Sequence, residues 1–172
     1  MNCAIVAQTL RTYCALYDYV LADTGPTLDD INVQVLDVAD QILLVTTPEL
    51  PSIHNCARFL ELAKTLGYLE KVRLVVNRAN SGVDVAALQQ TLHLPMFGRI
   101  VSSGKLVVEA ANRGTAVFAL DPAEHDQFTK DVVALTEHVV GEARPQPERF
   151  MLPLMQAPRR RWWPGFRLRA AA

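Results

Sequence analysis

Residues 41–51 read QILLVTTPELP, and this stretch decides the fold class. Its first part is an uninterrupted apolar run of the kind found in strands that are covered on both faces. Pro51 at its end suits the first turn of a helix, and apolar residues then recur at helical spacing as far as Leu60. The stretch therefore predicts a buried strand followed directly by a helix, which is the repeating unit of an α/β fold.

The same alternation continues along most of the chain. Strand-like runs lie at residues 17–23, 41–46, 71–77 and 96–101, and helical patterns separate them. Strands that alternate with helices form βαβ units around a mostly parallel sheet. We therefore predict an α/β domain over residues 1–140.

Several helix boundaries are predicted from residues that start or stop helices. Thr27 and Asp30 have the spacing of a capping box, which places a helix over residues 31–38. A later helix is expected from about residue 103 to residue 112, and the last one is expected to open at Asp121.

The bulk composition excludes several classes of protein. The chain has 172 residues, 50% of them hydrophobic, and a formal net charge of -1, which is typical of one soluble globular domain. Its three cysteines are odd in number and form no CxxC pair, so a disulfide framework or a zinc site is disfavoured. No apolar run approaches the roughly 20 residues of a membrane-spanning helix. These features favour a protein of the reducing cytoplasm.

Residues 141–172 differ from the rest of the chain. Prolines recur there, and from Pro158 onward the chain has five arginines and no acidic residue, so the preceding part carries a formal charge of -6. We predict a tail without regular structure. Its stretch RRRWWPGFR, residues 159–167, can bind an anionic membrane surface, bind nucleic acid by charge and stacking, or serve as a solubilising segment. Because the part of the chain before Pro158 is acidic, we expect no specific binding of nucleic acid.

The stretch YDYVLADTGP, residues 17–26, reads as a strand that ends in an acid and a tight turn. Ligands of open α/β sheets bind at the carboxyl ends of strands, so Asp23 would lie where the Mg²⁺ of a nucleotide binds. Asp23 can equally organise the turn through its own side chain. Asp-Thr-Gly is also the active-site triplet of aspartic proteases, but those enzymes are nearly all β, whereas a helical pattern follows here.

Five segments resemble, in sequence order, the later part of the ParA/MinD superfamily of deviant-Walker P-loop ATPases. They are YDYVLAD at residues 17–23, LDD at 28–30, LLVTTPE at 43–49, VVNR at 75–78 and VVEAANRG at 107–114. The similarity spans about residues 10–140, and LDD most resembles the CpaE/TadZ proteins of pilus assembly. The resemblance implies a partial P-loop NTPase fold of the SIMIBI type, a three-layer sandwich with a mostly parallel sheet.

The resemblance also implies roles for individual residues. Asn77, with Arg78 beside it, would lie on the adenine side of the site, and Asp23 would bind Mg²⁺ through water. An amide offers both a donor and an acceptor to a purine edge, although Asn77 can also be a simple strand-end turn residue. ATP and Mg²⁺ are the cofactors of the intact family protein. Residues 100–104, IVSSG, stand where the family commonly has a proline and then an acid in its base-side loop.

The 172 residues contain no G-x-x-x-x-G-K-[ST] loop and no deviant form of it. The lysine and amides of that loop normally hold the phosphates, so hydrolysis of ATP by this chain alone is expected to be negligible. We therefore interpret the chain as a fragment, a truncated reading frame or a natural partial domain. It would correspond to the C-terminal portion of an ATP-binding protein that positions or assembles pilus or secretion machinery. The alternatives are a non-catalytic interaction scaffold of ParA/MinD shape and part of a septum-site or chromosome or plasmid partition ATPase.

The same resemblance predicts the partners and the location. The expected partners are proteins of the pilus or secretion machinery and, in the intact form, a second copy of the protein. The expected location is the cytoplasm, with peripheral contact at the inner membrane or cell pole through residues 159–169.

Overall fold

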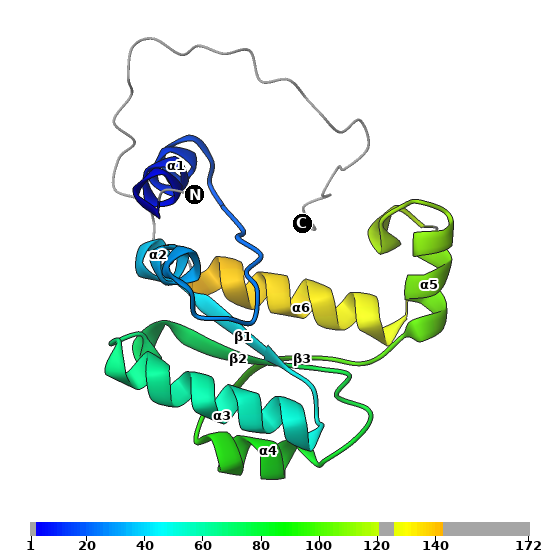
Figure 1. The fold of residues 1–172 in the computed structure, drawn as a ribbon. Coiled ribbons are helices and arrows are strands. Elements are labelled where there is room, and N and C mark those ends of the chain that lie inside the picture. Colours follow the sequence, from blue (N-terminus) through cyan, green and yellow to red (C-terminus); the bar gives the residue numbers. More distant parts are fainter. Residues whose placement is uncertain (1–2, 121–125, 143–172) are drawn as a thin grey trace, which may run out of the picture.

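A three-stranded parallel sheet with helices on both faces forms the centre of the structure, which confirms the predicted α/β fold class (Figure 1). The computed structural model describes residues 3–120 and 126–142. The strands are β1 (Ile42–Thr46), β2 (Val72–Asn77) and β3 (Met96–Ile100), and they lie in the order β1-β2-β3. The helices are α1 (Cys3–Leu16), α2 (Asp30–Val38), α3 (Leu50–Thr65), α4 (Val85–Leu92), α5 (Gly104–Asn112) and α6 (Gln127–Glu142), with short 3₁₀ turns η1 (Leu69–Lys71) and η2 (Val117–Ala119).

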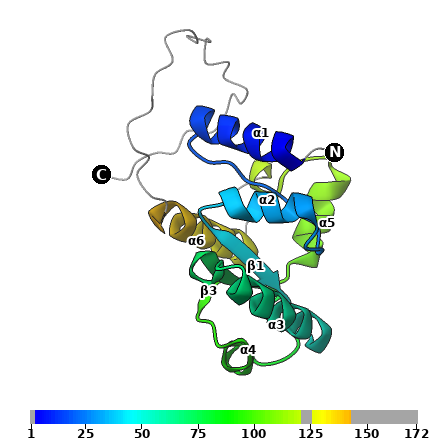
Figure 2. The ribbon, with the colours of Figure 1, turned by 60° about the vertical axis from the view of Figure 1, so that its left-hand side comes forward.

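The helices form a layer on each side of the sheet. Helices α3 and α4 lie on one face, α2 and α6 lie on the other, and α1 stacks on the outside of α2 (Figures 1 and 2). The main core joins alternate residues of β2, such as Leu74 and Val76, to the apolar stripes of α3 and α4. Val75 points to the opposite face and is also buried, as expected of a central strand.

Three of the four predicted strands are confirmed, each within one residue of its expected ends. The fourth prediction, a buried strand over residues 17–23, is wrong, because this segment has no regular structure and its side chain Leu21 is 87% exposed. A strand forms only when a neighbour accepts and donates its backbone hydrogen bonds. In the described part of the chain β1 pairs with β2 alone, and no strand pairs with residues 17–23.

One face of the sheet is more open over β1 than over β2. Val45 is 57% exposed, whereas its register partner Val75 on β2 is 1% exposed. Helix α6 packs mainly on β3 and therefore covers the β2 and β3 side of this face better than the β1 side.

One predicted helix start differs from the structure, and another lies outside the described residues. Helix α2 is capped by Asp29, whose Oδ1 accepts a hydrogen bond from the Asn32 amide, so the predicted capping box of Thr27 and Asp30 is wrong. A direct aspartate cap satisfies the same free amides of the first turn. The start predicted at Asp121 lies outside the described residues, as does the tail from residue 143 onward. Among the described helices, none has the length and hydropathy needed to cross a membrane.

Helix α2 is attached to the sheet through the turn that precedes β2. The Tyr68 hydroxyl donates a hydrogen bond to Asp37 Oδ1, and Lys71 Nζ donates to the Asp37 carbonyl oxygen over 3.1 Å. The hydrogen bond to Asp37, together with burial and the Asp37 charge, raises the pKa of Tyr68 to about 12. The neutral phenol is therefore favoured in the folded protein.

Replacing Tyr68 with phenylalanine tests this attachment. Because the pKa is raised on folding, the stabilisation is fully present below the unfolded pKa of about 10 and is lost as the pH rises through about 12. We expect Tyr68→Phe to lower the free energy of unfolding at pH 7 by about 1 kcal/mol. The difference between the two proteins should vanish as the pH rises to about 12, which urea unfolding at several pH values would measure. A difference that persists unchanged over this range would show that the hydroxyl does not act through its proton.

Candidate functional site

The carboxyl ends of all three strands lie at one edge of the sheet, because both strand pairings are parallel. We define the carboxyl edge as the loops that follow the strands: residues 47–49 after β1, 78–84 after β2 and 101–103 after β3. In open α/β sheets this is the edge at which ligands bind.

The loops after β2 and β3 are joined by a side chain and by the main chain. Asn80 Oδ1 accepts a hydrogen bond from the Ser102 amide over 2.9 Å, and Asn80 Nδ2 donates to the Ser102 carbonyl oxygen over 3.4 Å. The Ala79 amide donates to the Ile100 carbonyl oxygen over 3.0 Å. Asn80 thus pairs with Ser102 as a neighbouring strand would, and it fixes the spacing of the two loops.

The loops after β1 and β2 are joined by a backbone hydrogen bond. The Val83 amide donates a hydrogen bond to the Pro48 carbonyl oxygen over 2.8 Å, and Gly82 passes over the same oxygen with a φ of +81°. A Cβ on Gly82 would lie 2.0 Å from that oxygen. Only glycine therefore fits here, and all three loops form one connected surface.

Helix α6 holds the third loop from the other side. Asp131 is buried, and its carboxylate accepts hydrogen bonds from the Val101 amide over 3.0 Å and from Gln127 Nε2 over 2.7 Å. Ser103 Oγ donates a hydrogen bond to Asp126, and this bond is the main reason why the pKa of Asp126 lies below its usual value.

A cavity of about 260 Å³ adjoins this third loop. Ser103, Lys105, Leu106, Glu109 and Asp126 line it, so both charged and apolar atoms face the space. It opens at the beginning of α5, immediately after the loop that Asn80 fixes.

Asn77 and the loop of residues 101–103 are brought together at the carboxyl edge, as the sequence predicted. Asn77 is the last residue of β2 and pairs in register with Ile100 of β3. Its Oδ1 accepts a hydrogen bond from the Arg78 amide over 2.9 Å, and Arg78 has a left-handed φ of 55°. Within the described residues no acceptor is bound to Asn77 Nδ2, so its two N–H groups are available to a ligand.

The chain was compared with known proteins, and the curated relatives that match it are MinD proteins. No family model matches the sequence. The chain is 27% identical over 136 residues to the septum site-determining protein MinD of Bacillus subtilis. The aligned region covers 75% of this chain and 49% of that protein. The chain is therefore similar in sequence to MinD proteins. It spans about half the length of this MinD.

Solved structures of a ParA family ATPase and of MinD proteins share the fold of this chain. The ParA family ATPase of Chlorobium tepidum superposes with a TM-score of 0.72 at 23% identity, over 81% of this chain and 57% of that chain. MinD in the MinC:MinD cell division complex of Aquifex aeolicus superposes with a TM-score of 0.71 at 21% identity. The match covers 87% of this chain and 63% of that chain. MinD of Pyrococcus horikoshii, solved with Mg-ADP, superposes with a TM-score of 0.67 at 18% identity. The match covers 80% of this chain and 56% of that chain.

Asp23 does not lie at the end of a strand. Asp23 is exposed in the irregular segment between α1 and α2, and no hydrogen bond or ion pair of its carboxylate is found among the described residues. No group of three or more His, Cys, Asp or Glu side chains in the described ranges could hold a metal ion. Asp23 therefore offers a single carboxylate, and an Mg²⁺ ion there would take its other ligands from water and phosphate oxygens.

Sequence reasoning missed three residues that organise the edge. Asn80 and Gly82 lie in the string NRANSG, residues 77–82, whose Asn, Ser and Gly content marks a turn with a left-handed position. The sequence therefore predicts a loop here, but it does not predict that Asn80 and Gly82 contact Ser102 and Pro48. Asp131 interrupts the apolar stripe of α6 and gives no signal until β3 is placed beside it.

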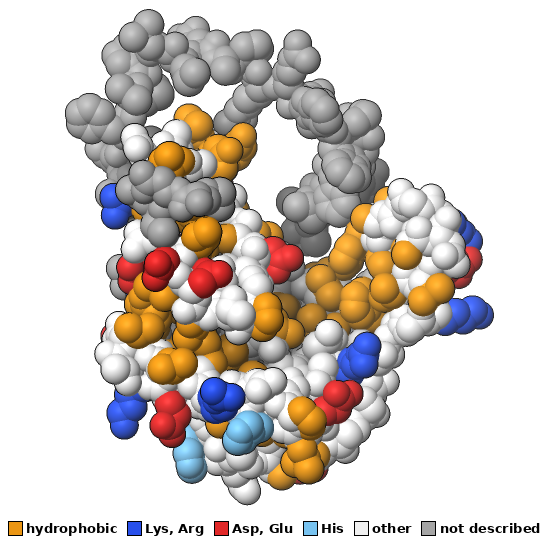
Figure 3. All heavy atoms as spheres, viewed as in Figure 1, with side chains coloured by type: hydrophobic (Ala, Val, Ile, Leu, Met, Phe, Trp, Pro, Cys, Tyr) orange, Lys and Arg blue, Asp and Glu red, His pale blue; other side chains and the backbone are white. Residues whose placement is uncertain are grey.

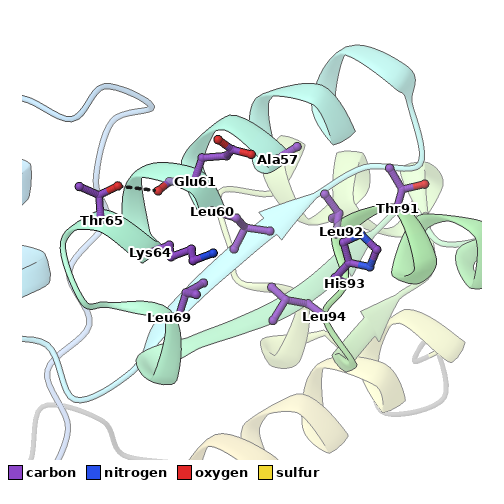
Figure 4. A pocket seen from close by; sticks show the side chains of 10 residues that line it. All are labelled: Ala57, Leu60, Glu61, Lys64, Thr65, Leu69, Thr91, Leu92, His93 and Leu94. Atoms are coloured by element: carbon purple, nitrogen blue, oxygen red, sulfur yellow. Dashed lines mark hydrogen bonds between the residues drawn. The ribbon is translucent and has the colours of Figure 1, made fainter.

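Another cleft lies at the opposite end of the sheet. It has a volume of about 500 Å³ and opens between α3 and the end of α4 (Figure 4). Lys64 extends into this space toward residues 92–94, over leucine side chains from both sides (Figure 4). Because Leu69 and Leu94 precede β2 and β3, this cleft is at the amino edge and is separate from Asn77.

Proposed function

We propose that this chain is the base-binding portion of a MinD/ParA-type ATP-binding switch, with Asn77 on the adenine side and Arg78 beside it. The observation that carries this proposal is the Asn77 amide. Its N–H groups have no partner among the described residues, and it lies next to a loop that is held by two hydrogen bonds between Asn80 and Ser102. The sequence similarity to MinD supports the same assignment.

The direction of the hydrogen bonds follows from the partners of Asn77. Its Oδ1 already accepts a hydrogen bond from the Arg78 amide, whereas Nδ2 has no partner among the described residues, so Nδ2 donates to a ring nitrogen of the purine, which is an acceptor. The amino group of adenine also needs an acceptor. Main-chain carbonyl oxygens of residues 101–103 are suited to this role, since a carbonyl oxygen has two lone pairs.

On the phosphate side of the site, we propose a role for Asp23. Asp23 would bind Mg²⁺ through water, as the family resemblance implies, and MinD of Pyrococcus horikoshii was solved with Mg-ADP. The 172 residues have no glycine-rich lysine loop, so we expect binding of the base and negligible hydrolysis by these residues alone. Adenosine is therefore the suitable probe.

Replacing Asn77 with aspartate removes both donors and keeps the size of the side chain. We expect Asn77→Asp to weaken adenosine binding about tenfold, because one hydrogen bond is lost and an acceptor now faces the ring nitrogen. Amide shifts in an NMR titration of the chain with adenosine would measure this, and the Arg78 and Ser102 amides should respond first.

Asn55→Asp is the matched control, since Asn55 is an exposed residue of α3. It should bind adenosine as the unmodified chain does. Equal weakening in both variants, or shifts confined to the cleft around Lys64, would contradict the assignment of Asn77.

For the cellular task, we propose the positioning of pilus or secretion machinery, in the manner of CpaE/TadZ proteins. The LDD segment at residues 28–30 supports this choice. A septum-site role is the second candidate, because the curated relatives are MinD proteins. Deletion of the gene separates the two: loss of pili supports the first, and misplaced septa support the second. Both tasks place the protein in the cytoplasm or at the inner membrane, with homodimerisation of the intact form.

A non-catalytic scaffold of the same shape is the remaining alternative. A chromosomal Asn77→Asp allele that retains the full cellular function would favour the scaffold, since an ATP-dependent switch needs its nucleotide.

A further inference from the structure

One side of α1 carries large apolar or aromatic side chains that are about half exposed. Ile5, Tyr13, Leu16 and Tyr17 follow one another at helical spacing around this side, and each is between 47% and 58% exposed. We call these four residues the α1 face. The opposite side of the helix, which contains the buried Ala7, packs on α2. Four uncharged, half-exposed large side chains on one surface are typical of a site that binds another segment.

Acidic side chains predominate on α2, against which the other side of α1 packs. Between residues 12 and 57 the chain has seven acidic residues and no lysine or arginine. Asp29, Asp30, Asp37 and Asp40 are exposed on α2 and at its ends, and acidic side chains gather over this helix in Figure 3. A segment that matches this surface must therefore combine apolar or aromatic side chains with positive charge.

We propose that residues 158–172 of the same chain dock on the α1 face. This segment contains five arginines and no acidic residue, together with Trp162, Trp163 and Phe166. Its aromatic side chains would cover Tyr13, Leu16 and Tyr17, while its arginines face the carboxylates of α2. Arginine and aromatic side chains are also those that contribute most at protein interfaces.

The connection between the two surfaces is short enough. Helix α6 ends near α2 in both ribbon views, so the chain leaves the described domain on the side of the sheet where α2 and α1 are stacked (Figures 1 and 2). Residues 143–157 bridge the distance, and 15 residues span at most about 50 Å and about 20 Å on average. A linker of this length gives an effective concentration on the order of millimolar, so weak contacts suffice.

Docking would control what else the tail can bind. A basic and aromatic segment held on its own domain is withheld from anionic membrane surfaces, and displacement from the α1 face would release it. Because the attraction is between surface charges, docking should weaken as the salt concentration rises. This inference does not depend on the nucleotide site.

The test uses the two tryptophans of the full chain, which are both in the tail at positions 162 and 163. Tryptophan emission and its quenching by acrylamide therefore report on the tail alone. We expect blue-shifted, protected emission at low salt and free, quenchable tryptophan at high salt. The double variant Asp30→Asn/Asp40→Asn should lower the ratio of docked to free tail about fivefold, and Leu16→Ser should have a similar effect.

Matched controls carry the same changes elsewhere. Glu61→Gln/Glu70→Gln removes two exposed acids, and Leu62→Ser changes an exposed leucine of α3. Both should keep the protected emission of the unmodified chain, with unchanged circular dichroism in all variants. The proposal is overturned if the tryptophans are as quenchable at low salt as in a peptide of residues 158–172. It is also overturned if protection depends on protein concentration, or if it arises only with anionic vesicles.

Discussion

Replacing Gly82 with alanine is expected to lower the free energy of unfolding by about 3 kcal/mol. The new Cβ would lie 2.0 Å from the Pro48 carbonyl oxygen, and the φ of +81° is one that side chains rarely adopt. The backbone must move, and the Val83 hydrogen bond to Pro48 is then lost as well. Urea unfolding followed by circular dichroism measures the change.

Gly114→Ala is the control for the left-handed backbone. Gly114 has a φ of +63°, and a Cβ there would meet no atom within 4 Å. We expect a loss of only about 1 kcal/mol, the usual strain of a side chain in this region. The difference between the two variants isolates the contact with Pro48. Equal losses would mean that this contact does not join the loops after β1 and β2.

The parts of the fold that could be predicted are those in which local pattern and final environment agree. Residues 42–46 and 72–76 are almost continuously apolar, and both are strands with a helix layer over at least one face. Pro51 in the first turn of α3 and Gly114 after α5 also act as their local chemistry predicts. Asn77 could be placed at the carboxyl edge because the end of a parallel strand determines its position.

The parts that could not be predicted depend on distant partners. Residues 17–23 have the composition of a strand, but composition cannot supply the neighbouring strand that a ladder needs. The pairing of Asn80 with Ser102 joins residues 22 positions apart, and that of Asp131 with Val101 joins residues 30 positions apart. Such contacts are determined by the crossing of β2, β3 and α6, which no local pattern contains.

The core beneath the carboxyl edge gives the other large effect. Leu74 lies in the middle of β2, is 1% exposed, and pairs in register with Leu44 on one side and Met96 on the other. Leu74→Ala should lower the free energy of unfolding by about 4 kcal/mol, because it removes buried apolar surface and leaves a cavity that the sheet cannot close. For a domain whose total stability is about 5–15 kcal/mol, this is a large fraction.

Leu62→Ala is the matched control, the same change at a residue of α3 that is 50% exposed. It should cost less than about 1 kcal/mol, since its side chain loses little contact with the core. Chemical unfolding of both variants gives the comparison, and the adenosine titration extends it to the site. Because β2 carries Asn77 three residues beyond Leu74, the Leu74 variant should also bind adenosine more weakly while still folded. A Leu74 variant as stable as the Leu62 variant would show that the contacts between the sheet and α3 do not hold the carboxyl edge in place.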